Sequence, residues 1–315
     1  MTEKTLSHIL NIKHPILMAP MFLVSNADMI ISALEMGCTG AIPAHNYRTD
    51  RELRQAIHEV RKKSNKPFGF NLIVNKSNPK YRKQLISLLD LKVDFIITSL
   101  GSPHEVIERC KPLGIKVFCD VVDVKYAKKV ENIGADAVIA VNSDAGGHCG
   151  GFKAKELIQQ LKKEINIPII SAGGVSNAHD VKSMLEFGAA GVSVGTIFIA
   201  SHESPVSSEY KQALVDFGTG DIVKTTKLTG SPLTVINTPY VQKIGTKANL
   251  LEWLINNSPQ TKKYAKMLLA WKGMQKVQQS AFKAGYDNVW CAGPAIGAIS
   301  EIRSVKEIIQ DLIEA

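Results

Sequence analysis

The chain has 315 residues, 45% of them hydrophobic, which is enough for one large α/β domain or two ordinary domains. Its formal charge of +9 could suggest a nucleic-acid partner, but the lysines are spread along amphipathic segments without interleaved aromatic residues, so we expect no nucleic acid and a solvated surface that attracts an anionic substrate or cofactor. No apolar run reaches the ~18 residues that a membrane-spanning helix needs, so no membrane span is expected either.

Short apolar runs alternate with longer amphipathic segments over the first ~200 residues, as in repeated βα units. The apolar runs predict strands at 14–21, 39–45, 67–74, 94–100, 116–122, 137–143, 168–174 and 191–198. The segments between them predict helices at 26–37, 49–63, 78–90, 103–113, 124–133, 153–165 and 177–188. Continuous apolar strands alternating with helices form parallel sheets that are covered on both faces, and eight units fit a closed barrel. We therefore predict an α/β protein with a (β/α)₈ TIM barrel.

A doubly wound parallel sheet is the alternative architecture for such a repeat. That fold should show a GxGxxG turn after an early strand. The first predicted strand ends in Met18-Ala19-Pro20-Met21 instead, which argues against the doubly wound sheet.

The alternation of apolar and amphipathic segments stops after the eighth predicted strand. A threonine-rich patch at 219–238 is followed by helical patterns near 246–257 and 259–284, and a strand-like or loop piece at 289–299 leads to a final helix at 305–313. We predict that 207–287 is a mainly helical insertion between the last strand and the C-terminal helix, and that it covers the substrate side. Residues 1–206 and 288–315 would then form the cofactor-binding barrel, with the final helix completing its wall.

Paired glycines flank a single histidine directly after the strand predicted at 137–143, in the stretch Asp144-Ala145-Gly146-Gly147-His148-Cys149-Gly150-Gly151. Glycines without Cβ atoms let the backbone approach a flat or anionic ligand closely. Histidine is the side chain there that can exchange protons near neutral pH. A loop histidine bonded to a neighbouring carbonyl is the bland alternative, but the position at a strand end favours a catalytic role for His148.

Two further glycine-bearing strand ends lead into helical structure. Gly173 and Gly174 follow the seventh predicted strand, and Gly195 and Thr196 come one unit later. Phosphate commonly binds after strands 7 and 8 of such barrels, where backbone N–H groups point at the anion. These four residues therefore predict a phosphate site.

Asn71, at the end of the third predicted strand, can both donate and accept hydrogen bonds, which suits the edge of a planar heterocycle. A turn or cap asparagine is the alternative interpretation. The backbone of 18–21 could line the same heterocycle. No pair of histidines and carboxylates has metal-ligand spacing, so we expect no metal.

Taken together, these residues resemble a known family, the flavin-dependent nitronate monooxygenases (formerly 2-nitropropane dioxygenases) and the related enoyl-acyl-carrier-protein reductases of the FabK type. The resemblance extends almost end to end. Its carriers are the segments 15–21, 144–148, 172–174, 194–196 and 292–297, together with Asn71.

The resemblance implies a TIM barrel that holds FMN non-covalently. The phosphate would lie on Gly173, Gly174, Gly195 and Thr196, and His148 would lie close to the reactive face of the flavin. The remaining contacts to FMN would come from Ala19, Pro20, Met21, Asn71, Asp144, Ala145 and Gly146. In the monooxygenases this histidine is assigned a role around the substrate nitro group, including proton abstraction from neutral nitroalkanes.

The chain departs from the family pattern at four positions. Asp144 stands where the family usually has Glu, Ser193 and Pro294 stand where many members have Gln, and Val141 replaces a glutamine that often precedes the acidic position. Proline cannot supply the amide group of glutamine, so the pocket at that end differs.

Three functions therefore stay open. The first is an FMN-dependent nitronate monooxygenase, which oxidises alkyl nitronates with O2 to a carbonyl compound and nitrite. The second is an NAD(P)H-dependent FMN reductase that acts on an enoyl thioester of acyl carrier protein or on a quinone. The third is a non-catalytic barrel or flavin-binding subunit, against which His148 argues.

Cysteine usage and the N-terminus indicate the compartment. The five cysteines are an odd number without a CxxC pair, which is typical of reduced thiols and not of a disulfide frame. The N-terminus lacks a basic segment followed by an apolar one, so no secretory signal is expected. We expect a cytoplasmic protein with a small-molecule substrate, and the resemblance implies a homodimer.

Overall fold

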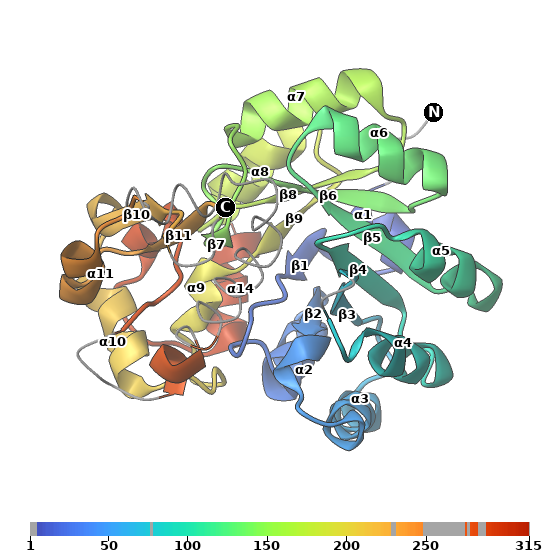
Figure 1. Ribbon diagram of the computed structural model, residues 1–315, viewed down its shortest axis with the longest axis horizontal. Helices are drawn as coiled ribbons and strands as arrows, with labels where there is room; N and C mark the ends of the chain where they lie inside the picture. Colours follow the sequence, from blue (N-terminus) through green and yellow to red (C-terminus); the bar gives the residue numbers. More distant parts are fainter. Residues whose placement is uncertain are drawn as a thin grey trace, which may run out of the picture.

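The eight apolar runs form parallel strands that close into a barrel (Figure 1). The structure is a computed structural model, which describes residues 5–75, 78–227, 231–247, 275, 278–282 and 288–314. Parallel pairing of β9 with β1 closes the barrel, in the order β1-β2-β3-β4-β5-β6-β8-β9. The strands are β1 Ile16–Met18, β2 Thr39–Pro43, β3 Gly69–Ile73, β4 Phe95–Ser99, β5 Lys116–Val121, β6 Ala137–Val141, β8 Ile169–Ala172 and β9 Gly191–Val194. The TIM barrel prediction is confirmed.

Helices cover the outside of the barrel where the amphipathic segments predicted them. These are α2 Ala27–Glu35, α3 Asp50–Lys63, α4 Tyr81–Asp90, α5 His104–Cys110, α6 Val124–Ile133, α7 Ala154–Glu164 and α8 Ala178–Glu186. The C-terminal helix α14 (Val305–Ile313) packs against both α8 and α2, so it completes the ring as predicted. Short 3-10 helices follow some of these elements: η1 Ala44–Asn46, η2 Lys111–Leu113, η3 Thr219–Asp221 and η4 Pro294–Ala298.

The helix α3 shows how local sequence sets these elements. Thr49 accepts a hydrogen bond from the N–H of Glu52, and the Glu52 side chain accepts one from the N–H of Thr49, which is a capping box. Leu53, Ile57 and Val60 recur at helical spacing and are buried against the barrel. The cap fixes where the helix begins, and the apolar stripe fixes which face it buries.

The barrel interior is apolar at one end and polar at the other. Phe95 and Phe118 stack at a centroid distance of 5.1 Å, and Leu6 of α1 (Leu6–Leu10), a helix that was not predicted, packs into the same buried cluster. Successive residues of a strand alternate in direction, so Ser99 and Asp120 face the interior further along the strands of these phenylalanines. The carboxyl ends of the strands therefore form the open, polar mouth of the barrel.

The segment predicted as a mainly helical insertion contains strands as well as helices. Its described part holds α10 (Ser208–Asp216), β10 (Ile222–Thr225), β11 (Leu233–Ile236) and α11 (Pro239–Ile244), which gather on one side of the barrel (Figure 1). The two strands arise within the threonine-rich patch. Of the helix predicted at 259–284, residues 275 and 278–282 are described and helical, and 246–257 lies largely outside the described residues.

The strands β10 and β11 pair antiparallel in a second, three-stranded sheet, and His148, expected at the end of the sixth barrel strand, lies on the third strand of that sheet. The short strand β7 (Gly147–His148) pairs antiparallel with β11, with Leu233 opposite His148. The eighth barrel strand also ends earlier than predicted, at Val194, because Thr196 begins the helix α9 (Thr196–Ile199). No helix in the described part of the chain is long and apolar enough to cross a membrane.

The interior packing makes Gly69 a sensitive position. A Cβ atom at Gly69 would lie 2.4 Å from the Phe95 ring and 2.5 Å from the Phe95 carbonyl oxygen. We expect Gly69→Ala to lower the free energy of unfolding by about 1–3 kcal/mol, measured by urea denaturation. Gly220→Ala is the control, because a Cβ there has no heavy atom within 4 Å among its described surroundings. Equal stability of the two variants would contradict the described packing.

Candidate active site at the barrel mouth

One buried asparagine joins the loop after β6 to the turn after β8. Asn142 Nδ2 donates to the carbonyl oxygen of Gly173 at 2.9 Å, and Asn142 Oδ1 accepts from the N–H of Asp144 at 2.8 Å. Gly173 has φ +112°, and a Cβ there would lie 2.4 Å from Asn142 Oδ1. Two of the predicted glycine segments are thus locked together. Asn142 was not predicted, although a buried asparagine directly after an apolar strand is a usable signal.

Backbone segments from three parts of the chain meet at Gly146. A Cβ on Gly146 would lie 2.9 Å from the Gly293 nitrogen and 3.0 Å from Thr196 Oγ1. Thr196 Oγ1 accepts the N–H of Gly293 at 3.0 Å in a buried position. A Cβ on Gly293 would in turn lie 2.5 Å from the carbonyl oxygen of Asp144. The C-terminal segment therefore closes one side of the barrel mouth, and its contacts leave no room for side chains.

The turn after β1 lies against Gly195, which directly precedes Thr196. A Cβ on Gly195 would lie 3.4 Å from Met21 Sδ and 3.5 Å from the Ala19 Cβ. Ser25 holds this turn, since its Oγ accepts the N–H of Met21 at 2.9 Å and donates to the carbonyl oxygen of Ala19 at 3.0 Å. Ala19, Pro20 and Met21, predicted from sequence, thus border the predicted phosphate segment.

Gly146, Gly173, Gly174, Gly195 and Gly293 together form what we call the glycine cluster. It presents free backbone donors. Among the described residues, no acceptor is found for the N–H groups of Gly174, Gly195 and Thr196. Unpaired N–H groups at neighbouring strand ends form an anion-binding concavity. The donor set fits the phosphate of a nucleotide, and the bare glycines fit a close-lying planar ring.

Asn71 lies on β3 inside the barrel and joins two residues that were not predicted. Asn71 Nδ2 donates to Ser99 Oγ at 2.5 Å, and Ser99 Oγ donates to Asp120 Oδ2 at 2.5 Å. Burial raises the pKa of Asp120 to about 6, against the lowering effect of its hydrogen bond from Ser99. Sequence could have indicated Ser99 and Asp120 as polar residues near the carboxyl ends of apolar strands.

The exposed side chain of His148 projects from β7, next to the glycine cluster along the chain. Desolvation by the surrounding protein lowers the pKa of His148, and no charged side chain of the described residues contributes to that shift. The imidazole is therefore neutral at pH 7, so that one ring nitrogen can accept a proton while the other donates a hydrogen bond.

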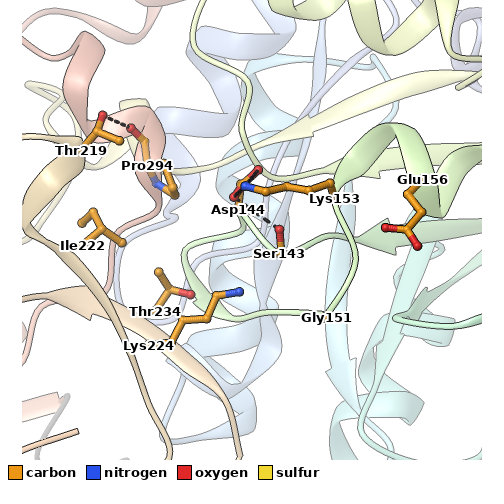
Figure 2. Close-up of a pocket in the computed structure, with 10 residues that line it drawn as sticks. All are labelled: Ser143, Asp144, Gly151, Lys153, Glu156, Thr219, Ile222, Lys224, Thr234 and Pro294. Carbon is orange, nitrogen blue, oxygen red and sulfur yellow. Dashed lines mark hydrogen bonds and ion pairs between the residues drawn. The ribbon is translucent and has the colours of Figure 1, made fainter.

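A pocket of about 350 Å³ lies beside the glycine cluster, between the loop after β6 and the second sheet (Figure 2). Lys153 Nζ contacts both carboxylate oxygens of Asp144, at 2.8 and 3.1 Å, so the predicted flavin contact Asp144 has its side chain in an ion pair. Lys224 also lines the pocket. The other lining residues are Ser143, Gly151, Glu156, Thr219, Ile222, Thr234 and Pro294. The pocket is polar and shares only Asp144 with the predicted flavin contacts.

Comparison with known proteins identifies the relatives of this arrangement. The sequence profile of the nitronate monooxygenase family matches residues 3–87 and 76–315. A (3aS,4S,5R,7aS)-5-hydroxy-7a-methyl-1-oxo-octahydro-1H-indene-4-carboxyl-CoA dehydrogenase of Rhodococcus jostii (strain RHA1) is 28% identical over 90% of this chain and 80% of that protein. A probable nitronate monooxygenase of Staphylococcus saprophyticus is 28% identical over 75% of this chain and 79% of that protein.

Two solved structures share the fold over nearly the whole chain. FabK from Thermotoga maritima has a TM-score of 0.85 and 31% identity, covering 99% of this chain and 96% of its own. A nitroalkane oxidase from Streptomyces ansochromogenes has a TM-score of 0.80 and 23% identity, covering 98% of this chain and 96% of its own, which shows a likeness of fold alone.

We predict that the Thr196 hydroxyl contributes measurably to stability, because it accepts the hydrogen bond from the Gly293 N–H. Thr196→Val keeps the side-chain volume but leaves the buried N–H of Gly293 without an acceptor, so we expect the free energy of unfolding to fall by about 1–3 kcal/mol. Thr196→Ser keeps the acceptor and should retain most of the stability. Urea unfolding of the protein without added cofactor measures both. A valine variant as stable as the serine variant would show that this hydrogen bond does not hold the C-terminal segment.

Proposed function

The chain belongs to the nitronate monooxygenase family of oxidoreductases, and from that premise we propose that it is an FMN-dependent enzyme that oxidises alkyl nitronates with O2 to a carbonyl compound and nitrite. FMN, when bound, supplies the electron transfer between substrate and oxygen. The free N–H groups of Gly174, Gly195 and Thr196 would hold its phosphate. Ala19, Met21, Asn71 and Gly146 would line its ring.

A neutral, exposed imidazole two residues after Gly146 in the chain is the observation that carries this proposal. His148 is exposed, and its pKa is lowered by desolvation, so it is a base at neutral pH and a poor general acid. Such a base can remove the α-proton of a neutral nitroalkane. It can also donate a hydrogen bond to an oxygen of the resulting nitronate. The base form is lost only as the pH falls below the lowered pKa, so the activity should persist into mildly acidic solution.

A thioester substrate with a nicotinamide reductant is the second candidate, and the polar pocket favours it. Lys224 lines the pocket beside the glycine cluster, and its cationic side chain suits a phosphate of a coenzyme or dinucleotide, whereas Lys153 there is paired with Asp144. The Rhodococcus relative, 28% identical to this chain, is named a carboxyl-CoA dehydrogenase, so its name fits a thioester substrate. Pro294, which replaces a common glutamine, also lines the pocket.

Anaerobic reduction of the bound flavin separates the two candidates. The purified protein, loaded with FMN, is mixed in one cuvette with an alkyl nitronate and in another with NADH or NADPH. We expect bleaching of the flavin absorbance by the nitronate and none by the nicotinamides. Rapid bleaching by a nicotinamide alone would overturn the monooxygenase proposal in favour of the reductase. A protein that binds FMN but is reduced by neither donor would indicate a flavin-binding subunit.

Removal of the imidazole tests the role of the histidine. For His148→Ala we expect nitrite release from a neutral nitroalkane to fall by about 10²–10⁴-fold, because the base is lost. Release from a preformed nitronate should fall much less, since its proton has already left. FMN content should not change. His104→Ala, at an exposed position on α5, is the control. Full turnover of the neutral nitroalkane by the His148 variant would remove this role.

A further inference from the structure

A carboxyl group stands inside the polar mouth of the barrel, and no cationic side chain of the described residues pairs with it. Asp120 lies on β5, beside Ser99 of β4, and its side chain accepts the hydrogen bond from Ser99 Oγ at 2.5 Å. The titratable groups that interact with it are Cys119 of the same strand and Tyr126 of α6, both uncharged near neutral pH because burial raises the pKa of each. Within the described residues, no Lys, Arg or His acts on its pKa. An ionised carboxylate here therefore relies on hydrogen bonds alone.

In the two hydrogen bonds that link Asn71, Ser99 and Asp120, the donor always lies on the Asn71 side. Asn71 Nδ2 also lies 3.3 Å from the carbonyl oxygen of Ile97, which can only accept, so the amide nitrogen must face β4. Ser99 Oγ receives the amide hydrogen and passes its own hydrogen to Asp120. This leaves Asn71 Oδ1 as the free end of the amide, with no partner among the described residues.

We propose that Asp120 is a positioning residue for the flavin: acting through Ser99, its carboxylate fixes the Asn71 amide so that Oδ1 accepts a hydrogen bond from a ring N–H of the bound cofactor. This inference rests on the proposed FMN-dependent function. An ionised carboxylate is a strong acceptor and orders the whole chain of hydrogen bonds, whereas a protonated carboxyl is a weaker one. Flavin affinity therefore rises with pH as Asp120 ionises, in the range around its pKa of about 6.

The test measures binding of riboflavin and FMN to the protein by quenching of flavin fluorescence, from pH 5 to pH 8. Riboflavin lacks the phosphate, whose own ionisation near pH 6 would otherwise contribute to the profile. The variants are Asp120→Asn and Ser99→Ala. Asp123→Asn is the matched control, because it removes the same charge nearby while asparagine keeps the N-cap of α6.

We expect the wild type and the Asp123 variant to bind riboflavin on the order of three- to tenfold more tightly at pH 8 than at pH 5. The Asp120→Asn and Ser99→Ala variants should both lose this pH dependence and bind riboflavin at pH 8 about as weakly as the wild type does at pH 5. Combining the two substitutions should weaken binding no further, because both interrupt one chain.

Two results would overturn the inference. An Asp120→Asn variant with the wild-type pH profile would show that the carboxylate does not act on the flavin. Should that variant fail to fold, a Ser99→Ala variant with the wild-type profile would show the same. A wild-type protein that binds neither flavin at any pH would instead reject the proposed function itself, which separates the two failures.

Discussion

The hydrogen bond from the Gly293 N–H to Thr196 Oγ1 is the contact on which the rest of the barrel mouth depends. It holds a segment from the far end of the chain onto the start of α9, and Gly146 fits between them only because it has no Cβ. Asn142 then ties this cluster to Gly173. The close backbone packing leaves N–H groups, and not side chains, at the surface where an anion would bind. A rigid cluster of this kind meets a phosphate without reorganising.

The two ends of the barrel interior perform different tasks. Phe95 and Phe118 stack on each other and share a buried cluster with Leu6 of α1. They fill the apolar end of the barrel and contribute stability through buried apolar surface. The same strands continue to Ser99 and Asp120, whose burial costs stability that their hydrogen bond offsets in part. Stability and function are thus separated along single strands, by four residues on β4 and by two on β5.

The barrel could be predicted from sequence because its signals are local. Each strand is a continuous apolar run, and helices such as α3 carry their own cap and apolar stripe. The second sheet could not be predicted from sequence. Its strand β7 has two residues and forms only because Leu233 and Thr234, far along the chain, pair with it. The glycines of the predicted phosphate segment were visible as a motif. The bond from Asn142 to Gly173, and the bonds that join Asn71 to Ser99 and Asp120, depend on distances between strands that no sequence pattern specifies.

A crystal structure of the protein with FMN would show which backbone groups hold the phosphate. We predict phosphate oxygens within about 2.7–3.2 Å of the backbone nitrogens of Gly174, Gly195 and Thr196. The ring would then lie over Gly146, with Asn71 Oδ1 at its edge. A phosphate bound instead between Lys153 and Lys224 in the neighbouring pocket would show that the glycine cluster has no part in holding the cofactor.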